Sequence, residues 1–144
     1  MAGTVYHRAN TAAVRDALES LRIPVPAAFR AFYERYQGPF SSRRTGFELL
    51  DLCEGTDSVI GLSRVCRQQH RFLERHLVLT SLLGNAVLVL DAQDDHVYNV
   101  DFEGGDEALL AGRLEWAWQS FEDFLLYYFG ASGSGGRGGC RTTG

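Results

Sequence analysis

The chain has 144 residues, 45% of them apolar, which suits one globular domain with a core of its own. No apolar run approaches the ~20 residues of a membrane span, and the N-terminus lacks the apolar core of a secretory signal. We therefore expect a cytoplasmic protein without membrane contact. The 3 cysteines are odd in number and unpatterned, which argues against a disulfide framework.

Two helices are predicted in the first third of the chain, after an irregular start over residues 1–9. The first begins at a cap of Asn10 or Thr11, and the second has Pro26 in its first turn. Residues 23–26 are extended, because each proline excludes the α region for the residue before it. The helices carry stripes of helical period, Val14, Ala17, Leu18 and Leu21 in the first and Phe29, Phe32, Tyr33 and Tyr36 in the second. An aromatic stripe is typical of a core, and a ligand box is the disfavoured alternative.

The middle of the chain predicts a strand and then a longer helix. Residues 46–52 form the first strand, and residues 53–57 form a turn. The helix that follows keeps a 3.6-residue period in Leu62, Val65, Cys66, Gln69, Phe72, Leu73 and His76. Its arginines are Arg64, Arg67, Arg71 and Arg75. We interpret them as the solvated side of an amphipathic helix, in preference to contacts with a phosphate or an acidic partner.

A hairpin at residues 86–102 is the centre of the predicted sheet. The run from Ala86 to Leu90 is short, apolar and rich in β-branched residues, which is typical of a strand buried on both faces. The polar residues 92–95 have the length and chemistry of a hairpin loop. The return strand alternates, with Tyr98, Val100 and Phe102 on one side, and is expected to be half-buried.

The last third predicts an acidic turn at 104–107 and a final helix. Leu114, Trp116 and Trp118 alternate, which fits an edge strand, although a short helix also fits. Ser120 with two acids behind it is typical of a helix start, and Gly130 ends that helix. The tail at 131–144 is rich in glycine and serine, so we expect it to be disordered beside a single domain at 1–130.

The predicted fold class is therefore α+β. An antiparallel sheet of about four to six strands carries two N-terminal helices, one mid-chain helix and a C-terminal helix packed on it.

No motif indicates catalysis or metal binding. Cys66, His70 and His76 have only loosely ligand-like spacing, and Asp91, Asp94 and Asp95 lack the remainder of a calcium loop. Nucleophile and nucleotide-binding motifs are absent from the sequence. We predict no catalytic residues, no metal and no cofactor. A small enzyme with scattered site residues around His70 or His96 is a remaining alternative.

Charge is distributed unevenly along the chain. Up to Gly84 there are eleven arginines and eight acids, whereas between Asp91 and Asp123 there are ten acids and one arginine, Arg113. Such a second half repels nucleic-acid phosphates and attracts basic partners. A solvated surface that serves solubility alone is the alternative.

Several short motifs occur in an order and spacing that resemble those of one superfamily. They are Ile23-Pro24-x-Pro26 with the aromatic run to Gly38, Gly46-Phe47-Glu48-Leu49, the strand Gly84–Asp91, His96-Val97-Tyr98, and Ser120–Leu125. Over about residues 10–130 the chain resembles the SUKH superfamily, whose bacterial members are mostly immunity proteins of polymorphic toxin systems. Asn85 departs from the pattern, because an acidic residue often follows that glycine, and the tail lies outside the family domain.

The resemblance implies a non-catalytic inhibitor that binds a cognate toxin domain, often a nuclease or deaminase. A regulatory scaffold of the same fold is the alternative. Because nuclease toxins are basic, we expect the acidic residues beside the hairpin to bind the partner. These residues are Asp94, Asp95, Glu103, Asp106 and Glu107. We predict no direct contact with nucleic acid, and a monomer or a homodimer.

Overall fold

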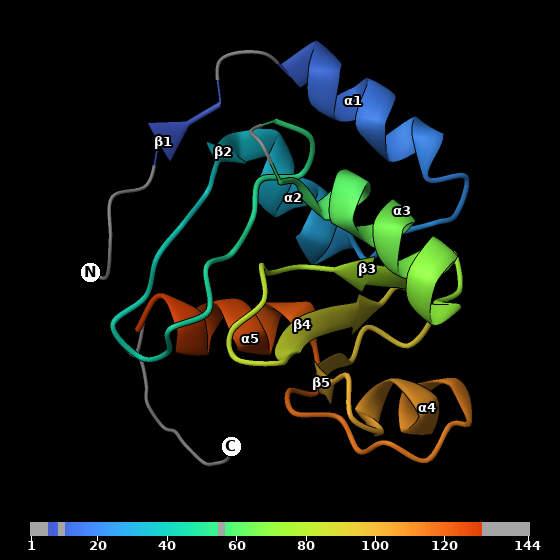
Figure 1. The fold of residues 1–144 in the computed structure, drawn as a ribbon. Coiled ribbons are helices and arrows are strands. Elements are labelled where there is room, and N and C mark those ends of the chain that lie inside the picture. Colours follow the sequence, from blue (N-terminus) through green and yellow to red (C-terminus); the bar gives the residue numbers. More distant parts are fainter. Residues whose placement is uncertain (1–5, 9–10, 55–56, 131–144) are drawn as a thin grey trace.

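The computed structural model describes residues 6–8, 11–54 and 57–130. The predicted tail at 131–144 and the candidate cap Asn10 lie outside these residues. In chain order the elements are β1 (Tyr6–His7), α1 (Thr11–Ser20), α2 (Ala27–Arg35), β2 (Tyr36–Gln37), α3 (Val59–His70), β3 (His76–Val78), β4 (Ala86–Asp91), β5 (Val97–Asp101), α4 (Gly105–Leu110) and α5 (Phe121–Tyr128) (Figure 1).

The predicted hairpin is confirmed as the centre of the main sheet. Strands β3, β4 and β5 lie in that order, and both pairs are antiparallel. Every residue of β4 after Ala86 is buried, as expected for a strand covered on both faces. In β5 Tyr98 and Val100 are buried and Asn99 and Asp101 are exposed, as predicted for a half-buried strand, and Val97 is the one residue of the outer side that is buried.

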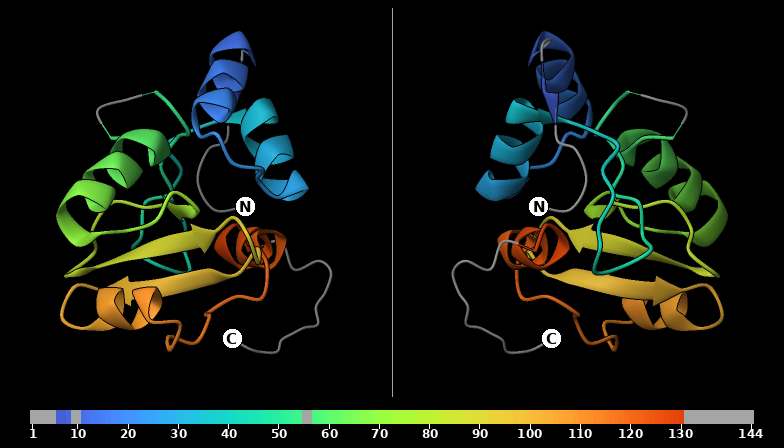
Figure 2. Two further views of the ribbon diagram at one scale, coloured as in Figure 1. Left: turned by 90° about the vertical axis from the view of Figure 1, so that its right-hand side faces the viewer. Right: turned by 90° about the vertical axis from the view of Figure 1, so that its left-hand side faces the viewer.

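The side chains of the sheet enter two apolar cores, and α3 contributes to both. Leu88, Leu90 and Val97 enter the larger core with side chains of α1, α2 and α5. The alternate residues Val87 and Val89 enter a smaller core with Cys66 of α3 and Leu109 of α4. Figure 2 shows α4 at one end of β4 and β5 and α5 at the other end.

The α+β class is confirmed, but the sheet has fewer regular strands than the four to six expected. Among the described residues, the main sheet has three strands, and β1 and β2 form a separate pair. The predicted strand at 46–52 contributes only isolated bridges, from Leu49 to Phe40 and to Thr80. It is cut short because Asp51 accepts hydrogen bonds from the backbone N–H groups of Cys53 and Glu54, which starts a turn.

The mid-chain helix is shorter than predicted. It ends at His70, because Arg71 takes a left-handed conformation with φ 64°. The predicted stripe beyond the helix is therefore divided between a loop and β3, and within the helix Val65 is 39% exposed although it belongs to the predicted stripe. The helix buries Ser63, whose hydroxyl accepts a hydrogen bond from Val78 N at 2.8 Å.

The C-terminal helix starts as predicted and fastens the irregular segments to the core. The Ser120 hydroxyl caps the helix by accepting a hydrogen bond from Asp123 N at 3.0 Å. At its other end, the buried Tyr128 hydroxyl accepts from Leu49 N at 3.0 Å and lies 2.7 Å from the carbonyl oxygen of Phe47, to which it donates. The hydroxyl thereby adds to the two backbone hydrogen bonds between Leu49 and Phe40 and fastens residues 46–52 to the helix.

Replacing Tyr128 by phenylalanine should lower the free energy of unfolding by about 1–3 kcal/mol, because the carbonyl oxygen of Phe47 loses the buried hydroxyl that donates to it. Tyr127→Phe is the matched control, since the Tyr127 hydroxyl donates to Arg44 O at 3.1 Å in an exposed position. Urea unfolding of both variants measures the difference. Equal midpoints for the two variants would contradict this role of Tyr128.

Candidate functional site

Strand β5 separates the five predicted acidic residues into two groups. Asp94 and Asp95 lie in the turn before the strand, and Glu103, Asp106 and Glu107 follow it. The 5 residues of β5 hold the groups about 17 Å apart. In Figure 2 the first end lies beside α5, and the second end carries α4. The predicted acidic residues therefore form two surfaces, which we name the turn end and the α4 end, and not a single patch.

At the turn end, both aspartates stabilise the backbone. Asp95 has φ 68° and accepts a hydrogen bond from Phe121 N at 3.2 Å, which fixes the start of α5. Asp94 accepts from His96 N at 2.9 Å and from the Tyr98 hydroxyl at 3.2 Å. Burial, with the Asp94 carboxylate adding to it, raises the pKa of Tyr98 to about 12. Asp94 is exposed, so its charge is available to a partner. The Asp95 carboxylate is instead engaged in its hydrogen bond to the first residue of α5.

A buried ionic cluster lies beneath the same turn. Asp91 and His76 are paired across β3 and β4, and both are almost fully buried. Arg75 Nε lies 3.1 Å from Asp91 Oδ2, and His76 Nε2 lies 3.8 Å from the same oxygen. Leu73 N donates to His76 Nδ1 at 3.1 Å, so a neutral imidazole carries its hydrogen on Nε2. Burial lowers the pKa of His76, while the Asp91 carboxylate opposes this effect.

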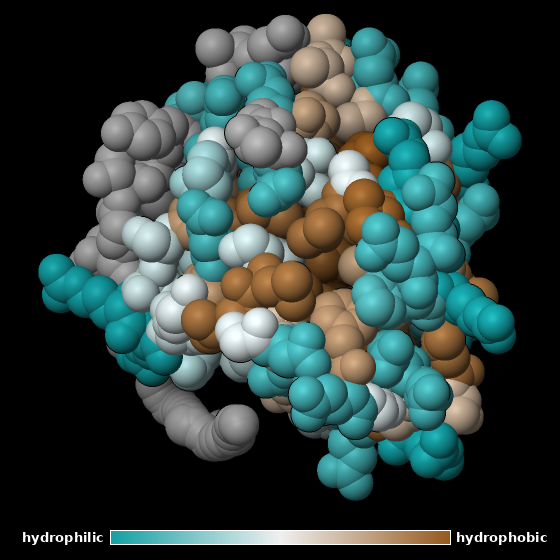
Figure 3. Space-filling model, viewed as in Figure 1, coloured by the Kyte–Doolittle hydropathy of each residue, from teal (hydrophilic) through white to brown (hydrophobic). Residues whose placement is uncertain are grey.

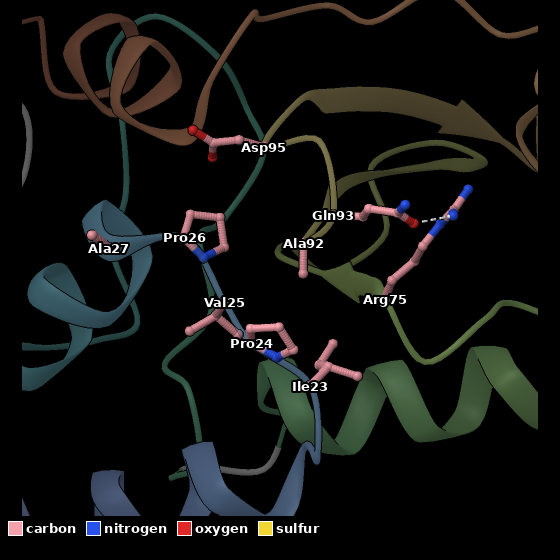
Figure 4. Close-up of a pocket in the computed structure, with 9 residues that line it drawn as sticks. All are labelled: Ile23, Pro24, Val25, Pro26, Ala27, Arg75, Ala92, Gln93 and Asp95. Atoms are coloured by element: carbon pink, nitrogen blue, oxygen red, sulfur yellow. Dashed lines mark hydrogen bonds between the residues drawn. The ribbon is translucent and has the colours of Figure 1, made fainter.

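An open cavity of about 640 Å³ lies beside this cluster (Figure 4). Its apolar wall is the extended segment 23–26, and Ala92 and Gln93 of the turn face that wall. The Arg75 guanidinium bonds to Gln93 and turns away from the apolar wall. Arg75 is also paired with Asp91, so the cavity offers mainly apolar contact, and Asp95 adds a carboxylate to its lining.

The turn end also presents an exposed aromatic pair, which we name the Trp116–His96 stack. The two ring centroids are 5.3 Å apart at 28°, and Trp116 is 48% exposed. Trp118 instead packs edge-on against Phe124 of α5 at 5.1 Å. The alternation of Leu114, Trp116 and Trp118 in the sequence predicts that both tryptophans lie on the same face of an edge strand. Trp118 bridges β5 at Val97, whereas Trp116 lies before this bridge and its ring stacks on His96.

The α4 end is an acidic helix where the sequence predicted a turn. Asp101 accepts hydrogen bonds from Glu103 N at 2.9 Å and Gly105 N at 3.2 Å, which sets the start of α4. Asp106 Oδ2 lies 3.8 Å from His70 Nδ1, while Glu103 and Glu107 are exposed. The sequence missed this helix because it is short and buries only Gly105 and Leu109.

Apolar surface gathers elsewhere on the molecule. Figure 3 shows apolar side chains at the centre of the face viewed in Figure 1, where the loop between β3 and β4 passes. Leu82 and Leu83 of this loop are 58% and 43% exposed. Scattered apolar side chains of this kind are common on protein surfaces and do not define a site alone.

Within residues 6–8, 11–54 and 57–130, no group of three or more His, Cys, Asp or Glu side chains is placed to hold a metal ion. No helix in the same residues is long and apolar enough to cross a bilayer. No protein-family model matches the sequence, and the search of curated proteins finds no relative of it.

Asp95→Ala should destabilise the protein by about 1 kcal/mol or more, because it removes the bond to Phe121 N and puts a β-carbon with no polar group at positive φ. Glu103→Ala is the control, because it removes the same charge from an exposed position and leaves the bond to Phe121 N in place. Thermal unfolding followed by circular dichroism compares them, and equal loss in both variants would refute the anchoring role of Asp95.

His76 should make the protein acid-sensitive. The folded state holds the pKa of His76 below its ordinary value of 6.5, so the unfolded chain takes up the proton first as the pH falls. Stability is therefore retained above about pH 6.5 and decreases below it, by at most about 1.4 kcal/mol per pH unit.

The variant His76→Asn keeps an acceptor for Leu73 N but cannot titrate. Urea unfolding between about pH 7 and about pH 5 should give a flatter pH dependence for this variant than for the parent. The surface variant His96→Asn is the control. Parallel curves for parent and His76→Asn would contradict the assignment.

Proposed function

We propose that the protein is a SUKH-type immunity protein that acts in the cytoplasm by binding a cognate toxin domain and blocking it without catalysis. The observation that carries the proposal is the uncompensated charge of its acidic surfaces. Within the described part of the chain, none of the five predicted acidic residues lies within ion-pair distance of an arginine. Only Asp106 has a basic neighbour, His70.

Uncompensated carboxylates favour a basic partner in two ways. They raise the rate of encounter through long-range attraction, and they disfavour acidic or nucleic-acid partners. A toxin that acts on nucleic acids must itself attract phosphates, so its active cleft is electropositive. The two acidic ends of the hairpin, separated by the length of β5, would meet two regions of such a cleft.

The roles of the five acidic residues differ in this proposal. Glu103 and Glu107 are exposed, and among the residues that the structure describes their carboxylates bond to no backbone group, so they contribute charge. Asp94 contributes charge from a fixed position. Asp95 supports the surface indirectly, by holding the start of α5.

Co-expression with a panel of nuclease and deaminase toxin domains tests the function. The proposal expects growth to be restored against at least one toxin, with a stable complex of the two purified proteins. A toxin that is chemically altered or cleaved by the protein, with no lasting complex, would contradict non-catalytic inhibition.

The double variant Glu103→Gln and Glu107→Gln should slow association with the neutralised toxin several-fold and weaken its dependence on salt. Asp16→Asn with Glu19→Gln is the matched control, because it removes the same charge from exposed positions on α1. Stopped-flow association at low and high ionic strength provides the measurement. Equal slowing by both double variants would show that net charge, and not the α4 end, is responsible.

A further inference from the structure

The Trp116–His96 stack is held rigidly, although it is exposed. Directly after Trp116, the backbone pairs with β5 through Ala117 N to Val97 O at 2.7 Å and Val97 N to Trp118 O at 2.9 Å. His96 Nδ1 lies 2.6 Å from Gln119 O, and because a carbonyl only accepts, Nδ1 is the donor. Both rings are thus positioned before any partner arrives, which lowers the entropy lost on binding.

The surroundings of the stack are acidic. The Asp94 carboxylate accepts from the backbone N–H of His96, and the Trp116 ring stacks on the His96 side chain, so both are neighbours of one residue. Glu115, beside Trp116 in the chain, is also exposed. No arginine lies within ion-pair distance of Asp94 or Glu115 in the part of the chain that the structure describes.

A partly exposed indole can stack with a nucleobase or with a planar cation. The carboxylates decide between these ligands, since they repel the phosphates that accompany a base. Among protein side chains, only arginine combines a planar cation for stacking with a fork of donors for a carboxylate.

We infer that the Trp116–His96 stack, together with Asp94, binds an arginine side chain of a basic partner protein. The guanidinium stacks on Trp116 and donates to the Asp94 carboxylate. The inference rests on the proposed function for the class of partner, a basic protein. It adds the residue type that the partner must present.

Fluorescence anisotropy of labelled arginine and lysine nonapeptides, with the full chain as the binding protein, tests this inference. The parent should prefer the arginine peptide, and Trp116→Ala should weaken that peptide about tenfold while leaving the lysine peptide nearly unchanged. Asp94→Asn should weaken the arginine peptide several-fold. Leu126→Ala is the control, since Leu126 is 49% exposed on α5 and has the same degree of exposure as Trp116.

Equal binding of both peptides by the parent, or an unchanged preference in Trp116→Ala, would overturn the arginine site. Tighter binding of single-stranded oligothymidine than of the arginine peptide would overturn it in favour of base stacking. The growth assay separates this failure from failure of the proposed function. If the protein prefers the arginine peptide but rescues growth from no toxin, the proposed inhibitor function is refuted and the arginine site is supported. If it rescues growth but does not prefer the arginine peptide, the arginine site is refuted and the inhibitor function is supported.

Discussion

The burial of β4 on both faces is the constraint on which the rest of the molecule depends. Because apolar cores lie on both sides of β4, this strand presents no side chain to a partner after Ala86. The two outer strands are also covered in part, by Leu49 beside β3 and by Trp118 beside β5, although Asn99 and Asp101 of β5 are exposed. The five acidic residues of the proposed binding surface therefore lie at the two ends of β5, not on the central strand.

The buried polar groups serve this architecture. Asp51 is buried with Arg8 and ties the segment before α1 to the turn after residue 50. Asp91 performs a similar task for β3 and β4, through Arg75 and the neighbouring imidazole. Such pairs add little net stability but are costly to break singly, because the remaining charge stays buried. They fix the position of chain segments whose secondary structure is irregular.

The sequence predicted the parts of the fold that carry a periodic signal. The unbroken run at 86–90 and the Ser120 cap were recognised because each depends on local chemistry. The segment at 46–52 could not be predicted correctly, since its conformation depends on a tyrosine from the far end of the chain, Tyr128. For the candidate site, composition located the carboxylates, but only the register of β5 shows that they form two surfaces.

Charge alone distinguishes basic partners from acidic ones, but it does not distinguish one basic partner from another. Directional contacts are needed for that discrimination, and flexible surface carboxylates such as Glu103 and Glu107 supply few. Asp94 differs from them because two hydrogen bonds fix its carboxylate next to a rigid aromatic pair. A fixed carboxylate beside a fixed indole selects geometry as well as charge. Under the proposed function, the α4 end would mainly accelerate encounter, and the turn end would determine which encounters persist.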